Sequence, residues 1–473
     1  MTGPRQGDNS VKNSDDAPTP RLRRALGPGA LLLFGLTYLA PVTVFTTYGI
    51  VTASTDNHLP AAYIVALVAM LFTAVSYGFM SRAFPSAGSA YTYTQRSFGR
   101  HVGFLTGWTL MLDYLFLPMI NFLLIGIYLN TQFPAIPGWV FALAALLLVL
   151  LFNVLGIALV AKLNVAIVAL SVLLVVVFVA LGIKELLSNP SAETPGLLAP
   201  LLPGSGGLGV IFSGAAVLAL SFLGFDAVST LSEEAKNPRR DIPRAIVLTT
   251  LIGGALFIVV SWIGALVAPD YQAFVDLDSA GVDLMAKVGG TLLTSFFVAV
   301  YVVGAFGSGL TTQVSVSRII YSMARDGVFP RFFARLHKRF RTPLGAAIAV
   351  STVSLLALFI TLDVAASMIS FGALVAFSMV NLSVIRHHLF PKGGRAEAAT
   401  ARDWVVYGIV PLVGFGLTVW LWTSLTQTTF IVGLSWMAVG IVYLAVLTRG
   451  FRRQPPALSF TDVVDDRATA DPR

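Results

Sequence analysis

Twelve long apolar runs, each bounded by polar or charged residues, organise almost the whole sequence. A bilayer core about 30 Å thick is crossed by a helix of about 20 apolar residues, and every run is roughly this long. The chain is therefore predicted to be an all-α integral membrane protein with twelve transmembrane helices. The predicted spans are 29–53, 60–83, 102–129, 138–157, 163–186, 207–234, 244–268, 288–314, 343–361, 364–386, 404–425 and 428–448.

The composition excludes other broad classes of protein. Hydrophobic residues make up 56% of the chain. Charged residues make up 11%, whereas soluble proteins carry about a quarter. The charges punctuate apolar runs instead of clustering with aromatic residues, so the net charge of +8 does not indicate nucleic-acid binding. The absence of cysteine excludes a disulfide-stapled secreted domain.

The basic residues are distributed unevenly about the predicted spans. With the N-terminus inside, 29 of the 31 Lys and Arg residues fall on the inner side, and only Lys184 and Lys287 fall outside. The positive-inside rule then predicts a multi-pass protein of the plasma (inner) membrane with both termini in the cytoplasm. Residues 1–25 and 452–473 are predicted to be disordered cytoplasmic tails around a transmembrane domain at 26–451.

Two of the predicted spans are interrupted at matching places. The first contains Pro41 among small and hydroxylated residues, and the sixth contains Gly224 and Asp226 within an apolar run. Unpaired backbone at membrane depth is tolerated where it is buried in protein or lines a cavity. Interrupted helices at corresponding positions in two halves indicate a secondary transporter with inverted repeats, here about 29–186 and 207–386. The spans at 404–448 are then peripheral. The alternative is two ordinary kinks.

Several stretches of the chain form recognisable motifs. They include Tyr38-Leu-Ala-Pro-Val-Thr-Val-Phe-Thr-Thr-Tyr-Gly, Leu112-Asp-Tyr-Leu-Phe-Leu-Pro-Met-Ile-Asn121, Ser221-Phe-Leu-Gly-Phe-Asp-Ala-Val-Ser-Thr and Asn237-Pro-Arg-Arg-Asp-Ile-Pro-Arg244. These stretches resemble amino acid–polyamine–organocation (APC) superfamily permeases, and in particular the putrescine importers. The resemblance covers about residues 25–450. It implies a LeuT-type 5+5 inverted-repeat fold with discontinuous helices 1 and 6. It also implies alternating access around a substrate held between helices 1, 3, 6, 8 and 10.

One position departs from the family pattern. The putrescine importers resembled here carry an Asp in helix 1 where this chain has Thr46, so an acid that could pair with a substrate amine is missing there. Some proton-coupled relatives carry a Lys in helix 5, where this chain has Ser171. A coupling proton or sodium ion is therefore compatible with the sequence, which does not identify the ion.

Two acids lie well inside predicted spans, away from the span ends: Asp113 in helix 3 and Asp226 in helix 6. A charge at the bilayer centre costs about 2.5–3.5 kcal/mol on insertion scales, so such residues are candidates for function. Asp113 could face a substrate ammonium group or accept hydrogen bonds from a neighbouring helix. Asp226 could bind an amine, take up a coupling proton, or cap the half-helix that follows it.

The remaining candidates surround these acids and the two breaks. Aromatic faces attract cations, hydroxyl groups can line a site, and free backbone groups at a break can bind a substrate carboxylate. The predicted substrate-binding residues besides the two acids are Ala40, Pro41, Thr43, Thr46, Tyr114, Ser221, Phe222, Gly224, Phe225 and Tyr301. Glu233, Glu234 and Arg244 are candidates for an inner gate of ion pairs, or are only solvated loop charges.

The predicted function is secondary active import of a putrescine-like polyamine, with an amino acid permease or exchanger of the same fold as the alternative. The two cargoes differ because an amino acid brings a carboxylate to the helix breaks and a diamine does not. From a different class, a non-transporting sensor or transceptor would keep the fold. The spans contain no nucleophile–base cluster, metal site or phosphate-binding loop, so no enzyme activity, metal or cofactor is expected. The expected partners are the small-molecule substrate and the lipid bilayer.

Overall fold

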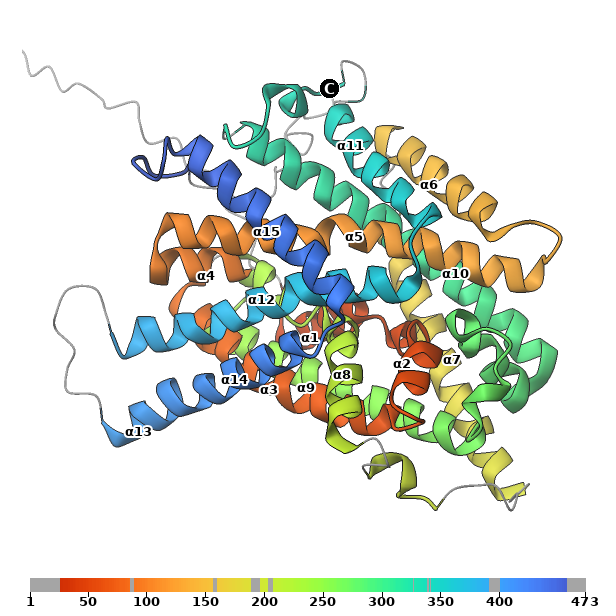
Figure 1. Cartoon of the computed structure of the whole chain (residues 1–473). Coiled ribbons are helices and arrows are strands. Elements are labelled where there is room, and N and C mark those ends of the chain that lie inside the picture. The colour runs from red at the N-terminus through yellow and green to blue at the C-terminus, as the bar shows by residue number, and fades with distance from the viewer. Residues whose placement is uncertain are drawn as a thin grey trace, which may run out of the picture.

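The computed structural model describes residues 26–85, 89–155, 160–188, 196–202, 207–325, 327–337, 340, 342–390 and 400–456. The predicted tail at 1–25 and most of that at 452–473 lie outside the described residues. The described part of the chain is helical, and its only β-type pairing is an isolated bridge between Leu26 and Ala235. Figure 1 shows the arrangement of the helices.

Within the described residues, eleven helical segments are long and apolar enough to cross a membrane. They are α1 with η1 (Pro28–Leu39 and Pro41–Phe45), α3 (Leu59–Ala83), α5 (Arg100–Gln132), α6 (Gly138–Leu155), α7 (Val160–Ser188), α8 with η3 and η4 (Gly207–Leu218, Ala219–Phe222 and Ala227–Glu233), α9 (Pro238–Val267), α10 (Ala280–Arg325), α12 (Leu362–His388), α13 with η9 and α14 (Ala401–Trp404, Val405–Ile409 and Val410–Thr423) and α15 (Gln427–Leu447). The protein is therefore an integral membrane protein.

The ninth predicted span, 343–361, coincides with a shorter apolar helix over Leu344–Leu358. It consists of α11 (Leu344–Ser354) and η8 (Leu355–Leu358). α2 (Tyr48–Ser54) continues the first predicted span after η1. The other helical pieces are shorter segments between the spans: α4 (Ser89–Phe98), η2 (Ala199–Leu201), η5 (Tyr271–Ala273), η6 (Leu277–Ser279) and η7 (Arg331–Ala334). The predicted spans thus match the helices closely in position. The exception is 343–361, where the apolar helix is shorter than the other spanning segments.

The first spanning helix is broken, as the sequence predicts. α1 ends at Leu39, and Ala40 takes a left-handed backbone conformation with φ of 49°. η1 follows from Pro41, whose ring nitrogen has no hydrogen to donate to the preceding turn. The helix then resumes as α2 after Thr46 and Thr47. The backbone between Leu39 and Tyr48 is therefore irregular in the middle of the protein.

The sixth predicted span is broken in the same manner. α8 continues into η3, and the chain then turns at Leu223 and at Gly224, whose φ is 121°. It resumes as η4 from Ala227. A φ in this range is readily adopted only by glycine, so Gly224 permits the break.

The two breaks touch each other. A Cβ atom added to Gly224 would lie 2.8 Å from the backbone nitrogen of Leu39 and 3.0 Å from the carbonyl carbon of Tyr38. Near the ends of the same two segments, the Leu26 amide donates to the Glu234 carbonyl at 3.0 Å. The Lys236 amide donates to the Leu26 carbonyl at 2.9 Å. The backbones of α1 and of the segment containing η4 therefore lie side by side along their length.

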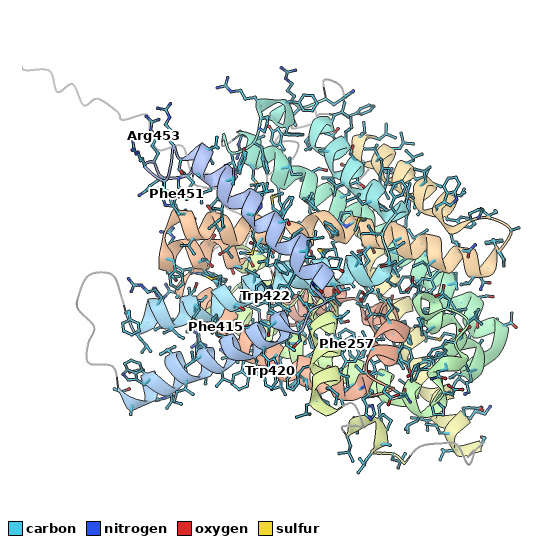
Figure 2. The ribbon with its side chains drawn as sticks, in the orientation of Figure 1. Phe257, Phe415, Trp420, Trp422, Phe451 and Arg453 are labelled. Atoms are coloured by element: carbon cyan, nitrogen blue, oxygen red, sulfur yellow. The ribbon has the colours of Figure 1, made fainter. Side chains whose placement is uncertain are left out.

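The other helices pack around this broken pair in two groups. α3 and α9 pack against each other, and they contact α8 and α1 respectively. Their interface buries Phe257, labelled in Figure 2, against Tyr63 at a ring separation of 5.4 Å. On the other side of the breaks, α5 packs against both α10 and α12. The site described below lies where the broken pair meets α5.

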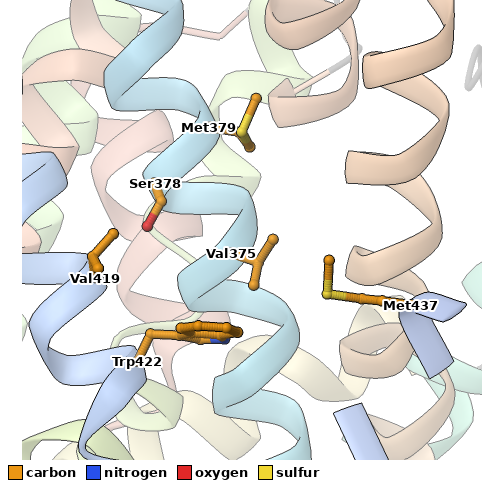
Figure 3. Close-up of a pocket in the computed structure, with 6 residues that line it drawn as sticks. All are labelled: Val375, Ser378, Met379, Val419, Trp422 and Met437. Carbon is orange, nitrogen blue, oxygen red and sulfur yellow. The ribbon is translucent and has the colours of Figure 1, made fainter. Parts of the chain in front are cut away.

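The last two spanning helices, α14 and α15, lie on the outside of this arrangement (Figure 1). Trp420 of α14, labelled in Figure 2, stacks on Phe212 of α8 with ring centroids 3.9 Å apart. Where α12, α14 and α15 meet, they leave a cavity of about 200 Å³ (Figure 3). Its lining is almost wholly apolar and consists of Val375, Ser378, Met379, Val419, Trp422 and Met437.

Candidate functional site

Two clusters of side chains lie along the break in the first spanning helix. The near cluster consists of Tyr38, Asp113, Tyr114 and Asp226, and the far cluster of Phe45, Thr46, Tyr128, Phe297 and Tyr301. Along both α1–η1 and α5 the near cluster comes first in the chain, so these two segments run in the same direction. Asp113 and Tyr128 are separated by roughly 22 Å along α5. We call the side on which α1 and α5 begin the near side.

The near cluster brings together the two acids that the sequence places in the membrane. Asp113 and Asp226 lie close enough to interact electrostatically. Tyr38 and Tyr114 lie within the same range of both carboxyl groups. Three separate segments therefore contribute to one acidic, tyrosine-lined site: the end of α1, the middle of α5 and the turn before η4.

Asp113 is held deep in the protein and keeps a free acceptor. Its side chain is 6% exposed, and its Oδ1 atom is buried without a hydrogen-bond partner. α12 approaches closely here, because a Cβ atom on Gly372 would lie 2.8 Å from the Thr109 carbonyl oxygen and 3.3 Å from the Asp113 nitrogen. An unpaired buried acceptor costs roughly 1–3 kcal/mol, which a bound donor would recover.

A backbone acceptor lies beside Asp113. Pro118 is inside α5, four residues after Tyr114. Proline has no amide hydrogen, so it cannot donate to the Tyr114 carbonyl, which loses its helical partner. One stretch of α5 thus offers both a carboxylate oxygen and a carbonyl oxygen, the atom types that accept hydrogen bonds from an ammonium group.

Asp226 is half-buried and is tied to the break that precedes it. The Gly224 amide donates to Asp226 Oδ1 at 3.2 Å. The Ser229 amide and hydroxyl both donate to the Asp226 carbonyl, at 2.9 and 2.6 Å. The side chain therefore satisfies one amide of the break, and the residue as a whole is less buried than Asp113.

The near cluster borders accessible space. Tyr38 is 41% exposed although it belongs to a spanning helix. Tyr114, Ala227 and Asp226 are also partly exposed, and Thr230 on the next turn of η4 is exposed. The near cluster is therefore only partly enclosed by the protein.

The far cluster, in contrast, is closed. The hydroxyl groups of Thr46 and Tyr301 lie 2.5 Å apart, and the Tyr128 hydroxyl donates to the Phe45 carbonyl at 3.0 Å. The Tyr128 and Tyr301 rings are 4.4 Å apart, and the Phe297 ring lies 5.3 Å from Tyr128. All five side chains are at most 5% exposed. These contacts join the first helix break to α5 and α10.

Comparison with known proteins assigns the family. The amino acid permease family model matches residues 30–450. This chain belongs to the amino acid permease family. The permease is thereby a member of the APC superfamily, as the motifs in its sequence suggest.

Three relatives illustrate the range of cargo in similar proteins. The low-affinity putrescine importer PlaP of Escherichia coli K12 is 41% identical over 437 residues, which are 92% of this chain and 96% of the relative. The branched-chain amino acid permease BcaP of Bacillus subtilis is 28% identical, over 90% of this chain and 94% of the relative. The cationic amino acid transporter 4 of Mus musculus is 32% identical, over 77% of this chain and 60% of the relative.

Three predicted site residues of the permease pack against neighbouring helices. Ser221 lies with its hydroxyl 3.2 Å from that of Tyr63 in α3. Phe222 packs against Phe257 of α9 at 5.7 Å. Phe225 is fully buried and packs against Tyr77 of α3 and Phe377 of α12. These contacts hold the second break in place against its neighbours.

Of the predicted residues of the first break, Ala40, Pro41 and Thr43 lie between the two clusters and Thr46 belongs to the far cluster. Pro41 is buried, and Ala40 and Thr43 are partly exposed. The Thr43 hydroxyl donates to the Leu39 carbonyl at 3.2 Å, so it satisfies a carbonyl at the end of α1. Thr46, predicted as a substrate-binding residue, is 5% exposed and paired with Tyr301, another predicted residue.

The predicted inner-gate residues lie at the near side. Arg244 is exposed and Glu234 is partly buried. Within the described residues these two side chains form no ion pair with each other. The side chain of Glu233 lies outside what the structure describes. Among all the residues that the structure describes, no group of three or more His, Cys, Asp or Glu residues is placed to hold a metal ion.

Sequence reasoning did not select several residues that the structure places at the site. Tyr38 and Tyr128 lie on the same segments as predicted residues, and Tyr128 follows Asp113 by about four helical turns. The free Tyr114 carbonyl could have been predicted from Pro118 alone, because a proline four residues later in a helix leaves that carbonyl without its usual amide donor. Gly372 had no such signal, since its role depends on contact between distant helices.

Proposed function

We propose that the permease is a secondary active transporter that imports a putrescine-like polyamine. It would work by alternating access in the plasma membrane, with twelve spans, a LeuT-type 5+5 fold and both termini in the cytoplasm. Under this proposal the near side faces the cytoplasm. The positive-inside distribution, the matched helix breaks and the likeness to PlaP over most of the chain support it.

The observation that carries the choice of cargo is the pair of acids in the near cluster. Asp113 and Asp226 interact, and no described Lys, Arg or His side chain forms an ion pair with either of them. Two like charges near each other in a medium of low dielectric constant repel strongly. A dication such as a diammonium compound would neutralise both, and the free Oδ1 of Asp113 and the Tyr114 carbonyl would accept its hydrogen bonds.

An amino acid fits this site less well. Its carboxylate would add a third negative charge beside the two acids. The amide of Gly224, a natural ligand for that carboxylate at the second break, already donates to Asp226. An amino acid permease or exchanger remains the second candidate because BcaP and the cationic amino acid transporter are also similar to the chain.

Ion coupling has a candidate residue in Asp226. It is the acid of the pair with the greater exposure, so it can exchange a proton with the accessible space around it. A proton or a sodium ion would supply the driving force, and no cofactor is needed. The near side has no Glu234–Arg244 ion pair and exposes Tyr38, which supports a conformation open toward that side.

The test is uptake of radiolabelled putrescine into proteoliposomes under an imposed inward proton gradient, repeated with a sodium gradient. Unlabelled polyamines and amino acids serve as competitors. We expect saturable, gradient-dependent uptake that polyamines inhibit and neutral amino acids do not. Inhibition by amino acids with uptake of labelled amino acid would move the cargo to the second candidate. Folded protein without any saturable flux would instead indicate a sensor or transceptor.

A further inference from the structure

Two glycines of α15 receive aromatic rings from two other helices. A Cβ atom on Gly440 would lie 2.5 Å from Nε1 and 2.8 Å from Cγ of Trp108 in α5. A Cβ atom on Gly433 would lie 2.5–2.6 Å from three ring atoms of Phe371 in α12. Residues seven apart lie on the same face of a helix, so one face of α15 seats both rings. Figure 1 shows α15 crossing these two helices.

The contact with α5 is reinforced by a reciprocal pair of hydrogen bonds. Trp108 Nε1 donates to the Trp436 carbonyl, and Trp436 Nε1 donates to the Trp108 carbonyl, both at 2.9 Å. The two rings stack at 4.9 Å with an angle of 20°. The Tyr443 ring of α15 also stacks on Trp108, with ring centroids 5.5 Å apart. Both indole donors are thereby satisfied, and the rotation of α5 relative to α15 is defined.

The two seated rings adjoin the contact at Asp113. Phe371 immediately precedes Gly372, the residue that lets α12 approach α5. Trp108 immediately precedes Thr109, whose carbonyl oxygen lies 2.8 Å from the Cβ position of Gly372. α15 therefore packs against both α5 and α12, next to the point where these two helices contact each other. Its packing toward α14 is looser, because the cavity lined by Met437 and Val419 lies there (Figure 3).

We propose that α15 is a positioning helix for Asp113: its two glycine seats and the Trp108–Trp436 pair hold α5 and α12 at the separation that buries the Asp113 carboxylate. Gly433, Trp436 and Gly440 touch no substrate in this proposal and act through α5 and α12. The proposal goes beyond the proposed cargo, because it concerns where the carboxylate lies. Only its transport readout rests on the proposed function.

The first experiment measures the exposure of position 113 without any cargo. The chain contains no cysteine, so Asp113→Cys introduces a single thiol. Its alkylation by a membrane-permeant maleimide is followed in the full-length protein carrying Gly440→Ala, Gly433→Ala or Gly416→Ala. Gly416 is the matched control, because a Cβ atom there meets nothing within 4 Å. We expect labelling several-fold faster with either seat filled and unchanged with Gly416→Ala. Equal rates in all three backgrounds would overturn the proposal.

The second experiment uses transport by the chain with Asp113 intact. Gly440→Ala should raise the KM for putrescine about tenfold more than it lowers the maximal rate per folded protein, because the carboxylate is displaced while the helix breaks are unchanged. Adding Trp108→Phe makes room for the new methyl group and should restore part of the KM. Additive effects of the two changes, with no recovery, would contradict a shared seat.

A milder variant covers the case in which a glycine substitution prevents folding. Trp436→Phe keeps an aromatic ring and removes only the donor to the Trp108 carbonyl. We expect it to accelerate labelling at position 113 less than Gly440→Ala does, while thermal unfolding confirms a folded protein. Labelling as slow as in the unmodified background would count against the proposal. If labelling responds to α15 and putrescine is not transported, the cargo assignment fails and the positioning role stands.

Discussion

The near and far clusters flank the same helix break and differ in what they leave unpaired. In the far cluster the Thr46, Tyr301 and Tyr128 hydroxyl groups all have partners, and every ring packs against another. In the near cluster Asp113 retains a free Oδ1 atom and Tyr38 is exposed. Hydrogen bonds satisfied within the protein stabilise a closed contact, whereas unpaired acceptors favour a ligand. Under the proposed function, this contrast supports a binding role for the near cluster and a closed contact at the far cluster.

Asp113→Asn gives the largest expected effect on this comparison. The change keeps the size of the side chain and removes its charge. Truncating one partner of a buried charge pair costs about 2–5 kcal/mol, equivalent to at least a thirtyfold loss of affinity. Radiolabelled putrescine uptake should therefore fall at least about thirtyfold or disappear. The exposed Asp56→Asn is the control and should transport normally. If Asp113→Asn bound putrescine with wild-type affinity, the near cluster could not be the substrate-binding site.

Gly224→Ala tests whether the near cluster needs the contact between the two breaks. The methyl group would meet the backbone of Leu39, which cannot move aside as a flexible side chain would. Gly99→Ala is the matched control, because Gly99 has a φ of 104° and open space around it. We expect Gly224→Ala to reduce transport by about tenfold or more and to lower the free energy of unfolding by about 1–3 kcal/mol. Equal losses in both variants would mean that backbone strain alone is responsible.

Asp226→Asn separates coupling from capping. Asparagine can still accept the Gly224 amide hydrogen, so the turn before η4 should persist. It cannot exchange a proton, and uptake that rises as the outside becomes more acidic in the unmodified protein should become nearly independent of pH. The measurement is initial uptake rate across a series of external pH values. A pH profile like that of the unmodified protein would leave Asp226 as a cap of the break only.

Tyr301→Phe and Thr46→Val give the smallest expected effect. Each removes one hydrogen bond of the far cluster, worth about 0.5–1.5 kcal/mol, while the ring contacts remain. Transport should change by roughly two- to tenfold, and the double variant should be no worse than either single one. A loss as large as that of Asp113→Asn would contradict the division between a closing and a binding cluster.

The sequence predicted the spans well because apolar length and charge position are properties of the chain itself. It also placed both breaks, since Pro41 and Gly224 act on their own backbone. The side-chain directions were harder to predict. Phe222 and Phe225 flank the break in sequence and yet pack toward other helices, because irregular backbone does not follow helical periodicity. Gly372 and Gly440 depend on which distant helix approaches them, and one sequence contains no record of that contact.

The Leu26–Ala235 bridge links the main chains of the two broken spans. Its two hydrogen bonds join main-chain atoms beside the entrance of α1 and the exit of η4. Because both hydrogen bonds involve Leu26, moving the start of α1 away from the end of η4 would break this pairing. The start of the first broken span and the end of the second are thus held together by main-chain atoms alone, a contact that does not depend on which side chains occupy these positions.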